Sequence, residues 1–527
     1  MNLPRKDEAF AFQTRVSDLL QNGLNNSLED VLDRAFPPDK IIRIDSLSID
    51  LGNISASNFE QEFKTRFIEA LTKSLATKKE DLDVVNDEDT VFSKARSLLN
   101  AFIFFLEKGY LPWYSSVEKK PDWETELLNA LSDKEYEYLL NWLRDNYKER
   151  PVIVERLVLQ FSDNFIGELL SKMPPGVDLP WDDLLADYVT LLNHIGGTNF
   201  QLKLQSAVIR EKIWQYAFQA LFDKKNDDPV FAILRLLFAH FRIKKKDLVH
   251  FKTKANKRLK TKAAKQAFEK LVDLSSLSRK DGPAGPAEKT AAQSTVESAD
   301  AQDSQDNPAL NGGSKNTCGT TLQNKNSEET SVPGGKANDK SLKDAKAGQA
   351  TNKKNSSLHT GDLIDVHNSG VVILHPFLKA YFADLDLLAE GDFISTEARA
   401  RAVLLLNYLA TGEADAAEFD LTLQKVLCGY PLEDTLTSSI ILTDKEIAGS
   451  DDLLNAVTNH WEPLKHTSIA GLRGTFLQRN GNIEVKESGW LLKVEQKTVD
   501  VLLGKLPWGF STIRLPWMQM MLSVDWY

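Results

Sequence analysis

His460, Glu462 and His466 form the tightest group of potential metal ligands in this chain of 527 residues. Imidazole nitrogens and carboxylate oxygens bind zinc, and a helical zinc site places its two histidines four positions apart, so that both lie on one face. The two histidines here are six positions apart, and Pro463 interrupts the segment. We therefore interpret these residues as surface side chains near a helix start, and expect no bound metal.

Other patterns that could support catalysis are incomplete. Gly334-Gly335-Lys336 resembles the end of a phosphate-binding loop, but Thr330 stands where the first glycine of that motif belongs. The chain has no Gly-x-Ser-x-Gly nucleophile elbow, and no cysteine–histidine arrangement stands out. Acidic pairs such as Asp451-Asp452 are typical of solvated faces. The sequence therefore predicts no catalytic residues, no cofactor and no enzyme.

One charged stretch is pronounced. From Arg242 to Lys265 the chain carries eleven Lys or Arg and a single acidic residue, Asp247. Three interpretations stay open: a solvated helix that runs into the next segment, a docking patch for an acidic protein, or an arm that binds nucleic acid. The stretch contains only one aromatic residue, Phe251, for stacking on bases, and the whole chain has a net charge of −11. Both facts disfavour nucleic acid and anionic membranes as partners.

Composition indicates the cellular compartment in which the chain folds. It has two cysteines, Cys318 and Cys428, which lie far apart, so a disulfide framework is not expected and a reducing cytosol fits. The first residues, MNLPRKDEAF, lack the apolar core of a signal peptide. Apolar runs such as AFIFFL, from Ala101, are too short to span a bilayer. We expect a cytoplasmic protein with no membrane segment.

A compositional change divides the chain. No Phe, Tyr or Trp occurs between Phe268 and Phe377, and residues 278–360 are rich in Ser, Gly, Ala, Asn, Lys and Asp. Such a segment cannot bury enough apolar surface to offset the entropy lost on ordering, so we predict a disordered linker. It separates a mainly helical region, 1–275, from a C-terminal α+β domain, 365–527. The predicted fold class is mainly α with small β elements.

In the N-terminal region the apolar pattern predicts one early strand and a series of helices. Alternation across 41–51 indicates a strand with a bulge, closed by Gly52. Ser132 and Glu135 form a capping box at the start of a helix. Apolar stripes with helical spacing predict helices across 59–71, 91–106, 151–172, 181–195, 208–223 and 229–242.

The C-terminal domain reads as helices followed by strands. Helices are predicted across 397–410, where Gly412 stands at the C-cap, and across 419–427, which Gly429 ends. Beyond Asn482 the pattern has period two, in Trp490, Leu492 and Val494 and again in Val499, Val501 and Leu503. This alternation predicts a small sheet near the end of the chain.

The triplet Leu-Pro-Trp occurs four times, ending at Trp113, Trp181, Trp508 and Trp517. Proline suits the first position of a helix, and the flanking Leu and Trp can anchor a rigid corner in the core. Architecture is one interpretation; the other is that the C-terminal pair presents its indoles to a partner. We expect Trp508 to belong mainly to the core and Trp517 to lie nearer a partner-binding face.

The residues themselves resemble a known family. SGVVILHPFL, from Ser369 to Leu378, resembles the SGLVLLHPFL opening of the contractile injection system tape measure proteins of phage-tail-like injection machines. Directly before Lys425, Gln424 stands where the resemblance leads us to expect Asn. Similar segments follow in order: Arg401–Leu406, Tyr408-Leu409, Thr411–Glu413, Lys425–Gly429, Pro431-Leu432, His460-Trp461, Leu464-Lys465, Gly471–Arg473, Phe476-Leu477, Arg479, Gly489-Trp490, Asp500–Leu503, Leu506–Trp508, Leu515–Met518 and Val524–Trp526. The N-terminal region adds Ile44-Asp45, Asp50–Gly52 and Phe105–Trp113.

The resemblance implies a non-enzymatic protein that acts inside the inner tube during assembly, sets tube length and links the baseplate end to the growing tube. Tube and baseplate proteins are then its partners, together with self-association. A chaperone or adaptor that leaves before the particle matures is the alternative, and a secreted enzyme is a third. The candidate interaction or motif residues are His375, Pro376, Phe377, Lys425, Cys428, Gly429, Trp461, Trp490, Trp508, Trp517 and Trp526. A chain of short capped helices is not itself a long ruler, so metering needs several copies, an extended state or a stretchable linker.

Overall fold

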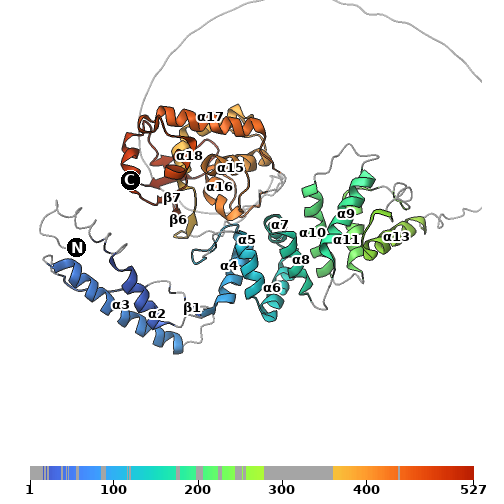
Figure 1. The fold of residues 1–527 in the computed structure, drawn as a ribbon, viewed down its shortest axis with the longest axis horizontal. Helices are drawn as coiled ribbons and strands as arrows, with labels where there is room; N and C mark the ends of the chain where they lie inside the picture. Colours follow the sequence, from blue (N-terminus) through green and yellow to red (C-terminus); the bar gives the residue numbers. More distant parts are fainter. Residues whose placement is uncertain are drawn as a thin grey trace, which may run out of the picture. The chain divides into compact units, whose positions relative to one another are not determined.

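A computed structural model gives the fold (Figure 1). Apart from the segment 278–359 and the chain ends, the gaps in its description are short. The described residues are 16, 19, 23–36, 40–42, 44, 47–54, 58–84, 91–115, 117, 120–173, 179–196, 206–223, 228–243, 248, 252, 257–277, 360–436 and 440–526. The predicted linker, 278–360, therefore lies outside the described residues apart from Thr360, and the predicted division into domains stays a prediction.

The first described elements are a helical hairpin and a small ribbon. Helix α2 (Asn25–Ala35) packs against α3 (Phe59–Val84), whose phenylalanines at four-residue spacing lie on the packed face. Strand β1 (Lys40–Ile42) pairs antiparallel with β2 (Val91–Ser93).

The expected strand across 41–51 is thus wrong in its extent. Leu47 and Ile49 alternate as a strand would, but they pack against the buried Leu71 and Leu75 of α3, and no strand among the described residues pairs with them. Alternating apolar residues can be buried against helices as well as in a sheet. Gly52 closes the segment in a left-handed conformation, with φ of 61°.

A series of helices follows and shares one core. They are α4 (Lys94–Lys108), α5 (Lys120–Ala130), α6 (Asp133–Asn146), α7 (Val152–Gln160), α8 (Asp163–Ser171), α9 (Trp181–Gly196), α10 (Ser206–Phe222), α11 (Pro229–His240) and α13 (Lys262–Leu277). Local signals set their bounds: the Ser132 N–H donates to the Glu135 carboxylate at 2.7 Å, which confirms the capping box. The predicted helix across 151–172 is two helices, because Ser162 caps α8 by accepting from the Phe165 N–H.

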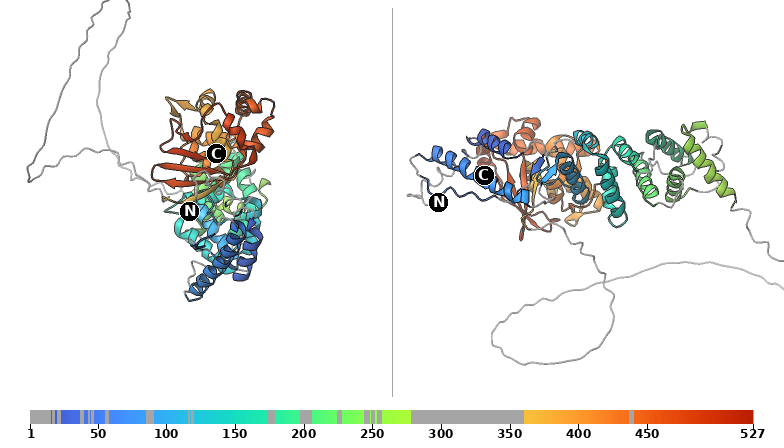
Figure 2. Two further views of the ribbon diagram at one scale, coloured as in Figure 1. Left: turned by 90° about the vertical axis from the view of Figure 1, so that its left-hand side faces the viewer. Right: turned by 90° about the horizontal axis from the view of Figure 1, so that it is seen from below.

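The described residues from 360 to 526, called the C-terminal domain below, fold around a five-stranded sheet. Its strands are β3 (Leu363–Val366), β6 (Gly481–Lys486), β7 (Gly489–Val494), β8 (Thr512–Ile513) and β9 (Met521–Asp525), in the order β3-β6-β7-β9-β8. All neighbours are antiparallel except β7 and β9, which run parallel. Figure 2 shows these strands side by side near the C-terminus. The predicted small sheet is confirmed, and it gains β3 from the beginning of the domain.

Helical segments pack around this sheet and complete the second core. They are η4 (Ser369–Leu374), α14 (His375–Asp384), α15 (Thr396–Thr411), η5 (Glu418–Leu421), α16 (Thr422–Leu427), α17 (Asp444–His460), η6 (Glu462–Leu464), α18 (Ile469–Leu472), η7 (Arg473–Leu477) and η8 (Thr498–Lys505), with a short ribbon of β4 (Leu388–Ala389) and β5 (Asp392–Phe393). Gly412 follows α15 with φ of 84°, which confirms the predicted cap.

One predicted strand is wrong. Val499, Val501 and Leu503 lie on the 3₁₀ helix η8, in which Leu503 is buried and Val501 is 64% exposed. Asp500 explains the difference, because its carboxylate accepts hydrogen bonds from the Lys497 N–H and from Arg479, both at 2.7 Å. A buried, bonded aspartate caps the turn and turns the intervening valines outward.

Candidate functional site: a buried ionic junction

The motif lysine, Lys425, is fully buried at the end of the C-terminal domain that faces α7. Its ammonium donates to Glu418 Oε1 at 2.6 Å, to the Leu432 carbonyl at 3.1 Å and to the Asp434 carbonyl at 2.8 Å. An ammonium has three donors, so every donor is used. Burial lowers the pKa of Lys425, and the Glu418 carboxylate opposes that shift by stabilising the charged form.

Glu418 also receives a cation from the helical region. Arg156, on α7, donates from Nε to Glu418 Oε2 at 3.2 Å, and both side chains are fully buried. The same guanidinium bonds the Leu106 carbonyl at the end of α4 and, at 2.6 Å, the Glu433 carbonyl. One carboxylate thus lies between two cations, and backbone carbonyl dipoles stabilise the remaining positive charge without neutralising it. We call Arg156, Glu418 and Lys425 the ionic junction.

The backbone at Gly109 closes tightly over the junction. Its φ is 81°, and a Cβ added there would lie 2.8 Å from the Leu432 carbonyl oxygen and 2.9 Å from both Arg156 Nη2 and Glu418 Oε1. A side chain at this position would therefore strain the backbone and collide with the ion pair. Gly109 lies in the segment Phe105–Trp113, which directly contacts the segment from Lys425 to Leu432. The sequence analysis did not predict this contact.

Aromatic rings pack beside the junction and contribute to its burial. Phe419, next to Glu418, makes edge contacts with Phe105 at 5.8 Å and with Trp123 at 6.1 Å between ring centroids. Tyr110 is buried in the core of the C-terminal domain. Burial raises the pKa of Tyr110 well above its ordinary value, and nearby carboxylates add to the rise. In such a dry environment, ion pairs interact more strongly than they do at a surface.

Neither Arg156 nor Glu418 was singled out from the sequence. The available signal was a charged residue inside an apolar helical run, because Ile153, Val154, Leu157 and Val158 surround Arg156 on α7. Charged residues are almost never fully buried unless they are paired, so a buried position predicts a partner but not its identity. That partner lies 262 positions away in the chain.

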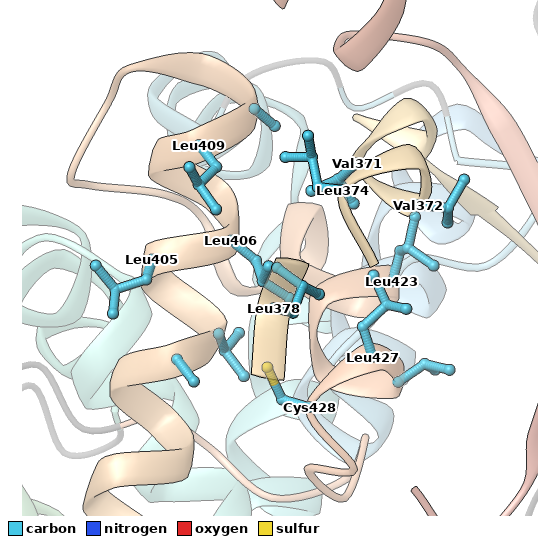
Figure 3. Close-up of a cluster of buried hydrophobic side chains, with 14 of the residues drawn as sticks. Val371, Val372, Leu374, Leu378, Leu405, Leu406, Leu409, Leu423, Leu427 and Cys428 are labelled. Carbon is cyan, nitrogen blue, oxygen red and sulfur yellow. The ribbon is translucent and has the colours of Figure 1, made fainter. Parts of the chain in front are cut away.

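Cys428 and Gly429 follow Lys425 and serve packing. Figure 3 shows the Cys428 sulfur among leucine and valine side chains. Burial raises the pKa of this thiol far above its usual range, so it stays protonated and unreactive. Gly429 has φ of 61°, and a Cβ there would lie 2.7 Å from the Trp517 carbonyl oxygen.

The expectation for the two C-terminal Leu-Pro-Trp triplets is wrong, because the structure reverses the burial of their indoles. Trp517 is 4% exposed, packs at a tilt against Phe382 and Phe393, and donates its indole N–H to the Leu427 carbonyl at 2.8 Å. Trp508 is only half-buried, contacts Phe377 edge-on, and donates to the Ile373 carbonyl. Both corners are anchored by indole hydrogen bonds, and burial decides which one belongs to the core.

The other tryptophans divide between core and surface. Trp461, Trp490 and Trp526 are buried in the C-terminal domain. Trp181 begins α9 and is buried, whereas Trp113, one turn beyond Gly109, is 56% exposed.

Two groups of the sequence analysis lie apart from the junction. His375 begins α14, and beside it Pro376 is exposed; burial lowers the pKa of His375, whose Nδ1 lies 3.0 Å from the Val372 carbonyl oxygen. His460 ends α17 and Glu462 begins η6. In the described ranges, no three His, Cys, Asp or Glu side chains gather as metal ligands would. Over the same residues, no helix is both long and apolar enough to cross a bilayer.

Comparison with known proteins identifies the family. A family model described as contractile injection system tape measure protein matches residues 1–526. Searches of curated proteins and of solved structures found no match. The match spans both motif segments that meet at the junction and nearly the whole chain. The chain therefore belongs to the contractile injection system tape measure protein family, and is a structural, non-enzymatic component of a contractile injection particle.

Proposed function

We propose that this tape measure protein works as a folded unit held closed by the ionic junction, and not as one extended strand. It associates with tube and baseplate proteins during assembly in the bacterial cytoplasm, and it lies in the lumen of the inner tube in the particle. The observation that supports a closed unit is the buried contact of Arg156 with Glu418, which joins the helical region to the C-terminal domain.

Reach along a tube limits what one copy can measure. A single helix of 527 residues would extend about 800 Å at ~1.5 Å per residue. The longest described helix, α3, has 26 residues and is therefore about 39 Å long. The other described helices are shorter. Metering by extension would require this folded structure to open, whereas metering by several closed copies would not.

The segment 281–357 is the remaining candidate for a stretchable ruler. Residues 1–280 and 358–527 belong to one compact unit. Pulling the segment out along the tube would draw its two flanks apart and break the junction, which leaves buried charges without partners. Because that costs several kcal/mol, we expect the junction to stay closed during metering.

The test is a deletion of about half of the segment 281–357, followed by electron microscopy of assembled particles. A closed unit predicts an unchanged length distribution, because the segment is not under load. A narrow distribution at a shifted mean would show that the segment measures length, and would overturn the proposal.

Protein analysis of purified particles tests the location. We expect the chain in stoichiometric amount with tube and baseplate proteins. If the chain were present during assembly but missing from mature particles, it would be an assembly chaperone or adaptor instead.

A further inference from the structure

Four exposed cations lie where the chain enters α13. We call Lys257, Arg258, Lys260 and Lys262 the basic turn, and all four are exposed. Buried Leu259 anchors it in the helical core. The basic turn is the best described part of the stretch from 242 to 265 that the sequence marked as basic.

A buried carboxylate fixes the backbone of this turn. Asp187 on α9 is almost fully buried and accepts hydrogen bonds from the N–H groups of Lys260 at 2.7 Å and Thr261 at 2.8 Å, and from the Thr261 hydroxyl at 2.7 Å. The cations therefore project from a held backbone. Such preorganisation lowers the entropy lost when a partner binds.

The chain neutralises this turn only in part. Lys260 lies 3.8 Å from Asp183, and Arg258 contacts the ring of His194. Lys257 and Lys262 have no ion pair with any residue that the structure describes. A fixed cationic surface with unused charges fits an acidic partner.

The C-terminal domain carries the opposite charge on a compact surface. Between 384 and 397 the chain has no Lys or Arg, and its five acidic residues are all exposed; we call this surface the acidic hairpin, made of Asp384, Asp386, Glu390, Asp392 and Glu397 around β4 and β5. Lys445 pairs with Asp386, and Arg399 with Asp392. Ile394 is 58% exposed beside them and adds an apolar contact surface.

Charge is segregated along the whole chain. The net charge is −11, and the stretch 242–265, with eleven cations and one aspartate, contributes +10, so the rest of the chain carries −21. Among the described residues no ion pair joins the basic turn to the acidic hairpin. Each copy thus presents two complementary surfaces on different parts of its fold.

We propose that the basic turn of one copy docks on the acidic hairpin of a second copy. The two surfaces differ, so this contact is heterologous and joins copies head to tail, into a ring where the rotation closes and into a row where it does not. The contact is mainly electrostatic and therefore weakens as salt screens it. A row of copies gives a tape measure a length set by copy number, although the docking itself does not depend on the proposed function.

Paired charge reversals test this contact in purified full-length protein by sedimentation velocity over a concentration series. Variant A is K257E/K262E, and variant B is D384K/E390K. Wild-type protein should associate at low ionic strength, near about 0.05 M, and dissociate near about 0.5 M, where the Debye length is only a few Å. Each variant alone should stay monomeric, because the reversals take the charge of the basic turn from +4 to 0 in A and that of the acidic hairpin from −5 to −1 in B, which removes the attraction between the two surfaces.

An equimolar mixture of A and B should associate again. The unchanged turn of B, at +4, fits the unchanged hairpin of A, at −5, so the mixture should form A–B pairs that neither variant forms alone. Matched controls reverse exposed charges elsewhere, K134E/K379E for A and E137K/E149K for B, and should associate as the wild type does. Equal thermal midpoints exclude misfolding.

Three results would overturn the proposal. They are a wild-type chain that stays monomeric at low salt, variants that associate as the controls do, and a mixture that fails to associate. Loss of wild-type association after nuclease treatment would also overturn it, since nucleic acid would then bridge the copies. None of these results bears on particle length, so they are distinguishable from failure of the closed-unit proposal.

Discussion

Replacing Glu418 by Gln should destabilise the protein by about 3–5 kcal/mol, the range for removing one partner of a buried ion pair. The carboxylate lies 2.6 Å from Lys425 Nζ and 3.2 Å from Arg156 Nε. At an effective dielectric constant near 20, those distances correspond to gross attractions of about 6 and about 5 kcal/mol. Water entry and rearrangement reduce the loss, but two buried cations remain without an anion. Since native proteins are stable by roughly 5–15 kcal/mol, the loss is a large share of the total.

The assay is urea unfolding followed by tryptophan fluorescence, to which Trp123, packed near Phe419, contributes a signal from the junction. The matched control is Glu462→Gln, which makes the same chemical change in an exposed pair with Lys465 and should cost less than about 1 kcal/mol. Equal midpoints for Glu418→Gln and Glu462→Gln would refute the junction as a stabilising contact.

Three further predictions concern packing, strain and pH. Trp517→Ala should cost about 3–5 kcal/mol in the same urea assay and Trp508→Ala clearly less, because only the first indole is fully buried; equal losses would contradict this order. Gly109→Ala should cost more than about 2 kcal/mol through positive φ and collision with the junction, whereas a neutral result would show that the backbone there can move. Burial raises the pKa of the Asp420 carboxyl, and the nearby His367 only partly offsets that rise. The folded state therefore binds the carboxyl proton more tightly than the unfolded state does. As a result, the free energy of unfolding falls as pH rises through the raised pKa. Asp420→Asn should therefore flatten stability against pH above about 4 and raise stability at neutral pH, as unfolding at several pH values can check.

Local signals predicted most of the helices. Ser132 with Glu135, and Gly412 after α15, set helix ends by hydrogen bonding and backbone conformation within a few residues. Such features do not depend on distant parts of the chain. The same holds for the alternation in β7, where Trp490, Leu492 and Val494 are buried on one face and Lys493 on the other face is exposed.

Predictions were wrong where a distant residue decides the outcome. Val499 and Val501 alternate with polar residues like a strand, yet the bond between Arg479 and Asp500 makes that segment a 3₁₀ helix. The order of burial of Trp508 and Trp517 likewise depends on which rings each meets, and sequence spacing does not contain that information. The other two residues of the junction, Glu418 and Arg156, lie 7 and 269 positions before Lys425, so the sequence motif identified one member of the site but not the residues that it meets.

A junction built from ions fixes one docking geometry more strictly than an apolar contact would. Leucines can slide past one another with little change in buried area, whereas each donor of Lys425 has one acceptor: Glu418, Leu432 or Asp434. A small shift would leave a buried donor or acceptor unpaired, at a cost of about 1–3 kcal/mol each. Gly109 adds a steric limit, because the backbone carbonyls approach where any side chain would stand. Metering by several closed copies, as proposed here, would need every copy to have the same shape, and this junction would supply that uniformity.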